Sequence, residues 1–285
     1  MRRTGLGTIC GLGAVVLCAS FAGSQERGRS ADYSEIREIA SAFVSALTST
    51  GLDNFKGLAF PCYLVMPGML DEVTEFKSEL DLAPPGDRVR FEKRDMAVRL
   101  AGKAAVCTLQ FRPTGSPQWA TATLLLTRPA GFWVVRAIAA SPNQLAADSD
   151  LDMVGALQSD FVRCITTNGP SVFDGLDFPL IFVNGRTGMA RLYDAPEDLP
   201  AAGHPLALRA RRLRWAYADN VAACTMELTR ADETAAEDVE AETAALVCAK
   251  WDEGWRAVAI LTGPSTGSEL EAGEGEAADG AEAGQ

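Results

Sequence analysis

The chain has 285 residues and a formal net charge of −12, from 38 acidic and 26 basic side chains, with a single histidine. This acidic balance argues against nucleic acid as a partner, because phosphates are bound by clustered Lys and Arg. No CxxC pair occurs among the seven cysteines. The sequence therefore predicts neither a metal site of the usual Cys/His spacing nor a cofactor.

Residues 1–24 have the pattern of an export signal. Arg2 and Arg3 precede an apolar stretch from Leu6 to Phe21, and small residues follow at Ala22-Gly23-Ser24. This order predicts cleavage and export to the periplasm or to the extracellular side of the cell envelope, with no membrane insertion afterwards. The alternative is an uncleaved signal-anchor helix, because the apolar stretch is close to the ~17 residues that span a bilayer.

The first predicted element after the signal is an amphipathic helix from Asp32 to Thr48, whose apolar residues recur at helical spacing. Asp32 and Glu35 form a capping-box pattern at its start. An apolar strand from Cys62 to Met66 follows, and then a second helix from Met69 to Leu80. Four further strands, joined by turns that contain Gly or Pro, complete the unit: Val89–Leu100, Ala104–Arg112, Gln118–Thr127 and Phe132–Ala139.

The same unit then recurs, because ten residues of a 23-residue segment reappear 118 positions later without a gap. The segment runs from Phe43 to Val65, and its copy runs from Phe161 to Val183. A repeat of this length is a whole domain, since solenoid units have roughly 20–50 residues. The second unit is predicted to have a helix that ends at Gly169, a strand at Leu180–Val183 and a helix at Met189–Leu199.

Both units share a break in the alternation of one strand. Val89 and Phe91 alternate, and then the apolar phase slips and resumes at Met96; the second copy slips in the same place, between Leu208 and Leu213. A shared slip predicts a β-bulge that bends each sheet. A strongly bent antiparallel sheet around a long helix makes a cone with a pocket.

The predicted fold class is therefore α+β, with two tandem cone-shaped domains at residues 31–143 and 152–263. Each is a bent, largely antiparallel sheet packed on a long N-terminal helix. Both strand faces contain many apolar or small residues, so we expect one face to meet the other repeat as an intramolecular pseudo-dimer. Residues 264–285 hold six acidic and no basic residues, which predicts a disordered tail that is either solvating or a docking arm for a basic partner.

This order of elements resembles the nuclear transport factor 2-like (NTF2-like) superfamily, including its SnoaL-like and ketosteroid-isomerase-like members. The segments that carry the resemblance in the first repeat are Leu47–Gly51, Phe55–Pro61, Gly102–Thr108 and Trp133–Ala139, and those in the second are Ile165–Gly169, Phe173–Pro179, Asp219–Thr225 and Trp255–Leu261. It covers nearly all of both repeats but includes no diagnostic motif. Members of the superfamily are enzymes, small-ligand binders or dimerisation modules, so the resemblance implies a fold and no particular activity.

Large aromatic residues recur in both units and are candidate walls of a ligand pocket, although the same residues could simply fill the core. They are Phe43, Phe60, Trp133, Phe161, Phe178 and Trp255. Arg212 and Arg214 are the candidate polar ligands, since alternation places both on one strand face, where they could hold a carboxylate or a phosphate. The alternative is that they pair with the chain's own acids, such as Glu242.

No catalytic residue is predicted. An isomerase-type site needs a shielded carboxylate base and an oxyanion donor. Tyr63 with Asp95 is a weak candidate pair, because Ile181 replaces Tyr63 in the second repeat. His204 lies in a Gly-His-Pro pattern typical of an exposed loop and has no Asp or Ser partner in a recognisable frame.

Cys224 and Cys248 would lie opposite each other if the hairpin between them turned at Ala236. Opposed cysteines in an antiparallel pair can reach disulfide distance. The alternative is two buried thiols that behave as small apolar side chains.

The sequence thus predicts an exported, non-catalytic protein that binds a small molecule, a peptide or a protein partner through cone pockets. One alternative is a SnoaL-like enzyme of the isomerase/cyclase or hydrolase type with one active cone, and another is a structural assembly module. The pocket interior distinguishes them. A buried carboxylate or His with a partner favours an enzyme, an apolar cavity favours a binder, and filled cones favour a scaffold.

Overall fold

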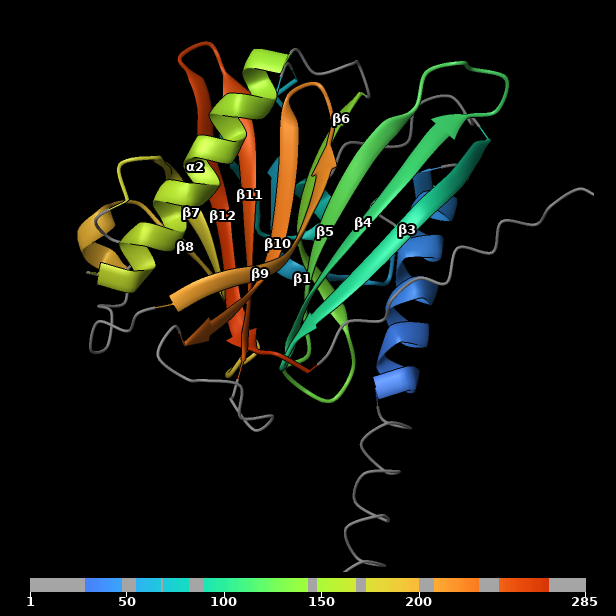
Figure 1. The fold of residues 1–285 in the computed structure, drawn as a ribbon. Helices are drawn as coiled ribbons and strands as arrows, with labels where there is room; N and C mark the ends of the chain where they lie inside the picture. The colour runs from blue at the N-terminus through green and yellow to red at the C-terminus, as the bar shows by residue number, and fades with distance from the viewer. Residues whose placement is uncertain are drawn as a thin grey trace, which may run out of the picture.

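The computed structural model of the chain describes residues 29–47, 55–67, 69–81, 90–142, 148–167, 173–199, 208–230 and 241–266. These residues form two six-stranded sheets (Figure 1). The strand order is β2-β1-β6-β5-β4-β3 in the first sheet and β8-β7-β12-β11-β10-β9 in the second, so the two repeats have the same topology. In the described part of the chain, no helix has the length and apolar character needed to cross a membrane.

The strands match the meander predicted from alternation, with small shifts at their ends. The first sheet consists of β1 Leu58–Val65, β2 Thr74–Phe76, β3 Phe91–Ala101, β4 Ala104–Pro113, β5 Ala120–Thr127 and β6 Val134–Pro142. The second consists of β7 Leu176–Asn184, β8 Met189–Tyr193, β9 Leu208–Tyr217, β10 Val221–Arg230, β11 Glu242–Trp251 and β12 Gly254–Pro264. The pairs β1–β6 and β7–β12 are parallel and the other described pairs are antiparallel, which confirms the α+β class with largely antiparallel sheets.

One long helix covers a face of each sheet (Figure 1). The helix of residues 29–47 buries Phe43 against the first sheet, in a cluster that includes Leu109 and Leu124. Helix α2, Asp148–Thr167, buries Phe161 in the equivalent cluster on the second sheet. The burial of an apolar helical stripe in a curved sheet is the cone architecture that the sequence predicts.

The predicted second helix of each repeat is wrong. Residues 74–76 form β2, which pairs antiparallel with β1, and a short 3-10 helix, Glu79–Asp81, follows. Met69 and Leu80, assigned to that helix by the sequence, are 77% and 94% exposed. In the second repeat, residues 189–193 form β8 beside β7, and Pro196–Asp198 is a 3-10 turn. A hairpin forms because the free edge of β1 or β7 offers backbone partners that an isolated helix could not use.

The predicted bulge is confirmed in both repeats. The register between β3 and β4 shifts between Arg94 and Ala97, and the register between β9 and β10 shifts at the equivalent place. Asp95 and Arg212 each have a φ of 50° at these bulges. The extra residue explains the slip in the apolar phase, because it re-aims every side chain that follows.

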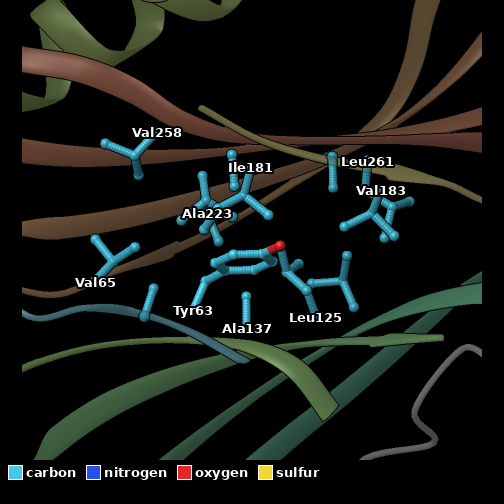
Figure 2. Packing of buried hydrophobic residues seen from close by; sticks show 14 of the residues in the cluster. Tyr63, Val65, Leu125, Ala137, Ile181, Val183, Ala223, Val258 and Leu261 are labelled. Carbon is cyan, nitrogen blue, oxygen red and sulfur yellow. The ribbon is translucent and has the colours of Figure 1, made fainter. Parts of the chain in front are cut away.

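A third apolar cluster contains residues of both sheets. It brings Tyr63 and Leu125 of the first repeat together with Ile181, Val183 and Val258 of the second. Figure 2 shows these side chains pointing toward one another from two layers of strands. The sheet faces that point away from the helices are therefore buried against each other. Removal of this apolar surface from water stabilises the folded state.

Candidate functional site

The aromatic residues at the centre of each cone are buried in the apolar cluster between the long helix and its sheet. Phe43 is 2% exposed and Phe161 is fully buried, and they meet Phe55 and Phe173 edge to face with ring centroids 5.9 and 5.7 Å apart. Neither Phe43 nor Phe161 lines the two cavities described below. Their predicted ligand-binding role stays a prediction, and their contacts are those of core residues.

Trp133 and Trp255 make the same polar contact in each repeat. The Nε1–H of Trp133 donates to Oδ1 of Asp32 over 3.1 Å, and the Nε1–H of Trp255 donates to Oδ1 of Asp150 over 3.0 Å. Asp32 and Asp150 are 118 residues apart, at the start of the two long helices. Each carboxylate also binds a cation, Arg128 in the first case and Lys250 in the second.

The sequence pattern predicts a capping box at Asp32 and Glu35, whereas in the structure both carboxylates accept from Trp133. The helix already includes residue 29, and Glu35 accepts the backbone N–H of Trp133 over 3.0 Å. The recurrence of Asp at positions 32 and 150, in register with the repeated Phe residues, was the signal that could have revealed it. The two carboxylates tie each helix to the start of the last strand of its own sheet.

The remaining predicted residues lie in different places. Tyr63 is on β1 in the layer between the sheets, where burial raises the pKa of its hydroxyl above the ordinary value. Asp95 is exposed on β3 and pairs with Arg94 over 3.2 Å. Three strands separate β1 from β3 in the sheet order, so the candidate pair of Tyr63 and Asp95 is not brought together. His204 lies outside the described residues.

The predicted opposition of Cys224 and Cys248 is wrong. Cys224 lies opposite Leu246, and Cys248 lies opposite Ala222. Moving the centre of a hairpin by one residue shifts each partner by two, which changes the opposite residue but keeps the face. Both cysteines consequently point into the same apolar cluster as free, buried thiols.

The larger of the two cavities, here called the Trp251 cavity, has a volume of about 670 Å³. Residues 70–72 of the first repeat form one wall. Phe178, Trp251 and Arg256 of the second repeat form part of the other. The indole nitrogen of Trp251 is buried and has no hydrogen-bond partner in the described part of the chain. Phe60, the counterpart of Phe178, is half-buried and its carbonyl accepts from Arg136 over 3.0 Å.

The smaller cavity, here called the arginine cavity, has a volume of about 110 Å³ and lies between β3–β4 and β9–β10. Its ten lining residues are five pairs, and the members of every pair are 117 positions apart. The pairs are Ala97 with Arg214, Val98 with Trp215, Arg99 with Ala216, Val106 with Ala223, and Thr108 with Thr225. Each repeat therefore supplies one arginine, at a position where the other repeat has alanine.

Arg99 is the residue that sequence reasoning missed. It is 5% exposed, and its Nη1 has no hydrogen-bond partner among the described residues. Its signal was a charge inside the otherwise apolar run from Ala97 to Ala101. Burial, followed by the proximity of Arg214 and Arg212, lowers the pKa of Arg99, whereas Glu227 acts in the opposite direction.

The two predicted arginines have separate roles around this cavity. Arg214 is exposed and lines it. Arg212 is 63% exposed and its Nη1 donates to Oε1 of the buried Glu227 over 3.2 Å. Glu242, the acid considered as an alternative partner, pairs with Arg186 instead. No group of His, Cys, Asp or Glu side chains suited to a metal ion is found in the described part of the chain.

No family model matches the sequence, and no similar curated protein is found. Among solved structures, the chain is similar to an NTF2-like protein of unknown function from Shewanella baltica, with 11% identity and a TM-score of 0.32 over 40% of this chain and 94% of that one. A candidate ketosteroid isomerase from Parabacteroides distasonis has 16% identity and a TM-score of 0.30, over 43% and 92%.

A candidate dehydratase of the NTF2-like family from Streptomyces avermitilis has 20% identity and a TM-score of 0.33, over 41% of this chain and 99% of that one. Each similarity spans about one repeat. The fold predicted from the sequence is confirmed by the two sheets themselves, because the chain consists of two tandem units, each with a helix on a curved six-stranded sheet of the same strand order.

Proposed function

We propose that the protein is an exported, non-catalytic binding protein that takes a small molecule in the Trp251 cavity. The observation that carries this proposal is a cavity of about 670 Å³ with walls from both repeats. Cavities that hold small ligands have volumes of roughly 300–1,000 Å³. In this proposal residues 1–24 direct export to the periplasm or beyond the cell envelope, and residues 264–285 are an acidic tail.

The charges around the Trp251 cavity favour a ligand with an amine or another cationic group. Asp71, Glu72, Asp177, Asp252 and Glu253 line it, against the two cations Lys250 and Arg256. The charge of Lys250 is already paired, because its Nζ donates to both carboxylate oxygens of Asp150 over 2.9 Å each. An aromatic wall with an acidic rim suits a cation, because ring faces and carboxylates both attract positive charge.

The proposal includes an intramolecular pseudo-dimer of domains 31–143 and 152–263. Contacts made by equivalent turns support it: the N–H of Lys103 donates to the carbonyl of Gly185 over 2.6 Å, and the N–H of Asn220 donates to Oγ of Ser141 over 3.1 Å. Lys103 and Asn220 are equivalent residues in the turns β3–β4 and β9–β10. A twofold arrangement requires that the same turn of each unit contacts the other unit.

The non-catalytic part of the proposal rests on the carboxylates inside the cones. Asp32 and Asp150 are each engaged by an indole N–H and a cation. A general base needs a free lone pair directed at a substrate. The carboxylates at the Trp251 cavity stand beside an aromatic wall, an arrangement that suits the binding of a cation.

Nuclear magnetic resonance of the five tryptophan indole groups tests ligand binding directly. We expect small amines, from a panel that also contains amino acids and carboxylic acids, to shift the indole signal of Trp251 and to leave that of Trp133 in place. Trp251→Phe assigns the signal, and Phe178→Ala should weaken binding, whereas Phe60→Ala at the equivalent position should not. A ligand that shifts only the signals of Trp133 and Trp255 would place binding inside the cones and contradict the proposal.

A fragment of residues 29–145 tests the pseudo-dimer. The fragment would expose the apolar face around Tyr63 and Leu125, so we expect it to self-associate or to aggregate. Analytical ultracentrifugation and urea unfolding measure this. A monomeric, soluble and cooperatively folded fragment would contradict the pseudo-dimer and leave the ligand proposal unaffected.

A further inference from the structure

We propose that the arginine cavity is a second binding site, which holds a small oxyanion between Arg99 and Arg214. It shares no residue with the Trp251 cavity and does not depend on the function proposed there. The ligand class is a free carboxylate or phosphate group, small enough to lie between β3 and β9.

The first argument is the state of Arg99. Its side chain is 95% buried, and its Nη1 has no hydrogen-bond partner among the described residues. A guanidinium group carries five N–H donors in a fixed fork, and burial of such a charge without a partner is strongly unfavourable. A carboxylate or phosphate satisfies two of these donors at once, which is the arrangement that arginine forms best.

The second argument is the charge that remains after internal pairing. Arg99, Arg212 and Arg214 bring three positive charges to this region, and Glu227 brings one negative charge. Oε1 of Glu227 already accepts from Arg212 and from Oγ of Ser265, over 3.2 and 3.3 Å. Counted over the described residues, two positive charges are left in a chain with a formal charge of −12, and the arginines that carry them, Arg99 and Arg214, line the same cavity.

The third argument is the space itself. Ala97 and Ala216 occupy the positions equivalent to Arg214 and Arg99, so each arginine projects into room that the opposite repeat leaves empty. The volume of about 110 Å³ corresponds to three or four waters at about 30 Å³ each. A cavity of this volume accommodates inorganic phosphate or a short carboxylate. The hydroxyls of Thr108 and Thr225 line the same cavity and can donate to further oxygens.

Isothermal titration of the full chain with inorganic phosphate, and separately with acetate, tests the proposal at constant ionic strength. We expect one oxyanion site per chain in the wild type. Arg99→Met should weaken binding by roughly tenfold or more, since a hydrogen bond to a charged group contributes about 1.5–3 kcal/mol. Arg163→Met, which removes an exposed arginine from α2, should leave the affinity unchanged. The comparison of phosphate with acetate identifies the preferred oxyanion.

A second measurement separates binding from folding. Removal of a buried, unpaired charge should not destabilise the protein, so Arg99→Met should unfold at the same urea concentration as the wild type or at a higher one in buffer without oxyanions. If Arg99→Met does not fold, Arg214→Met carries the comparison, because Arg214 is exposed. Failure of both phosphate and acetate to bind the wild type would overturn the proposal. Unchanged affinity in both variants would overturn it as well, and neither result bears on the Trp251 cavity.

Discussion

Asp95 and Arg212 share a backbone φ of 50° and occupy the same position in two strands that are 117 residues apart in the sequence. Both are the extra residue of a bulge, and both are followed by strand positions that line the arginine cavity. The bend that gives each sheet its curvature therefore also sets the direction of the side chains between the repeats.

The first prediction concerns this bulge. A positive φ is strained for most residues and free for glycine, so Asp95→Gly should raise the free energy of unfolding by about 0.5–1 kcal/mol. Asp95→Val should lower it, because a β-branched side chain tolerates this conformation poorly. Urea unfolding measures both. Ala97→Gly, two residues further along the same strand and without a positive φ, is the control and should destabilise; a stabilising Ala97→Gly would refute the explanation.

The second prediction concerns the approach of the two repeats at Gly185. A Cβ added there would lie 1.9 Å from the carbonyl oxygen of Ala101, which is backbone and cannot rotate away. We expect Gly185→Ala to cost about 1–3 kcal/mol of stability. Gly155→Ala is the matched control, because a Cβ at Gly155 meets nothing within 4 Å and alanine stabilises a helix by about 0.5–1 kcal/mol. Equal stability of the two variants would mean that the repeats do not approach so closely.

The third prediction concerns the carboxylate that binds Trp255 and Lys250. Asp150→Asn removes the charge that both donors share, and we expect a loss of about 1–3 kcal/mol in urea unfolding. Asp152→Asn, on an exposed position of the same helix, removes the same charge and should change stability by less than about 0.5 kcal/mol. If the two variants behave alike, the contact does not stabilise the cone.

The fourth prediction concerns alkaline pH. Burial raises the pKa of the Cys62 and Cys224 thiols to about 12 and that of Cys248 further still. The folded state thus retains protons that the unfolded chain releases above its thiol pKa of about 8.5. The stability associated with these thiols is fully present below that pH and is lost as the pH rises toward the folded values.

Each of these thiols should contribute a slope of up to about 1.4 kcal/mol per pH unit between roughly pH 9 and pH 12. Urea unfolding at several pH values measures the slope, and Cys248→Ala should reduce it by one thiol's share. The same burial should keep the three thiols unreactive toward a thiol reagent at pH 8 until the protein unfolds. Rapid modification of Cys248 in the folded protein would contradict its position in the core.

Much of the fold could be predicted because it depends on local pattern and internal repetition. The slip between Phe91 and Met96 required an extra residue in the strand, and its recurrence near Leu213 marked the same bend twice. The helix predicted from Met69 to Leu80 was wrong, because the helical spacing of its apolar residues does not reflect a buried helix face. Part of it pairs instead with the free edge of β1, the strand that directly precedes it, and the spacing of apolar residues does not show such a pairing.

The candidate sites were less accessible to prediction, because they form where the repeats meet. Trp251 ends β11, and its cavity also needs residues 70–72 of the first repeat. Arg99 lies inside an apolar strand, where its burial depends on a sheet 117 residues away. Alternation along one strand placed Arg212 and Arg214 on one face but could not identify the residues of the other repeat that lie across from them.

The exchange of arginine and alanine between the repeats makes the two sides of the arginine cavity different from each other. Two identical subunits would contribute the same arginine twice, and both guanidinium groups would be buried or both exposed. An anion could then bind in either of two equivalent orientations. In this protein the buried guanidinium group belongs to Arg99 and the exposed one to Arg214. Because both cones belong to one polypeptide, their sequences differ at these positions, and the cavity has one buried and one exposed guanidinium group in place of two alike.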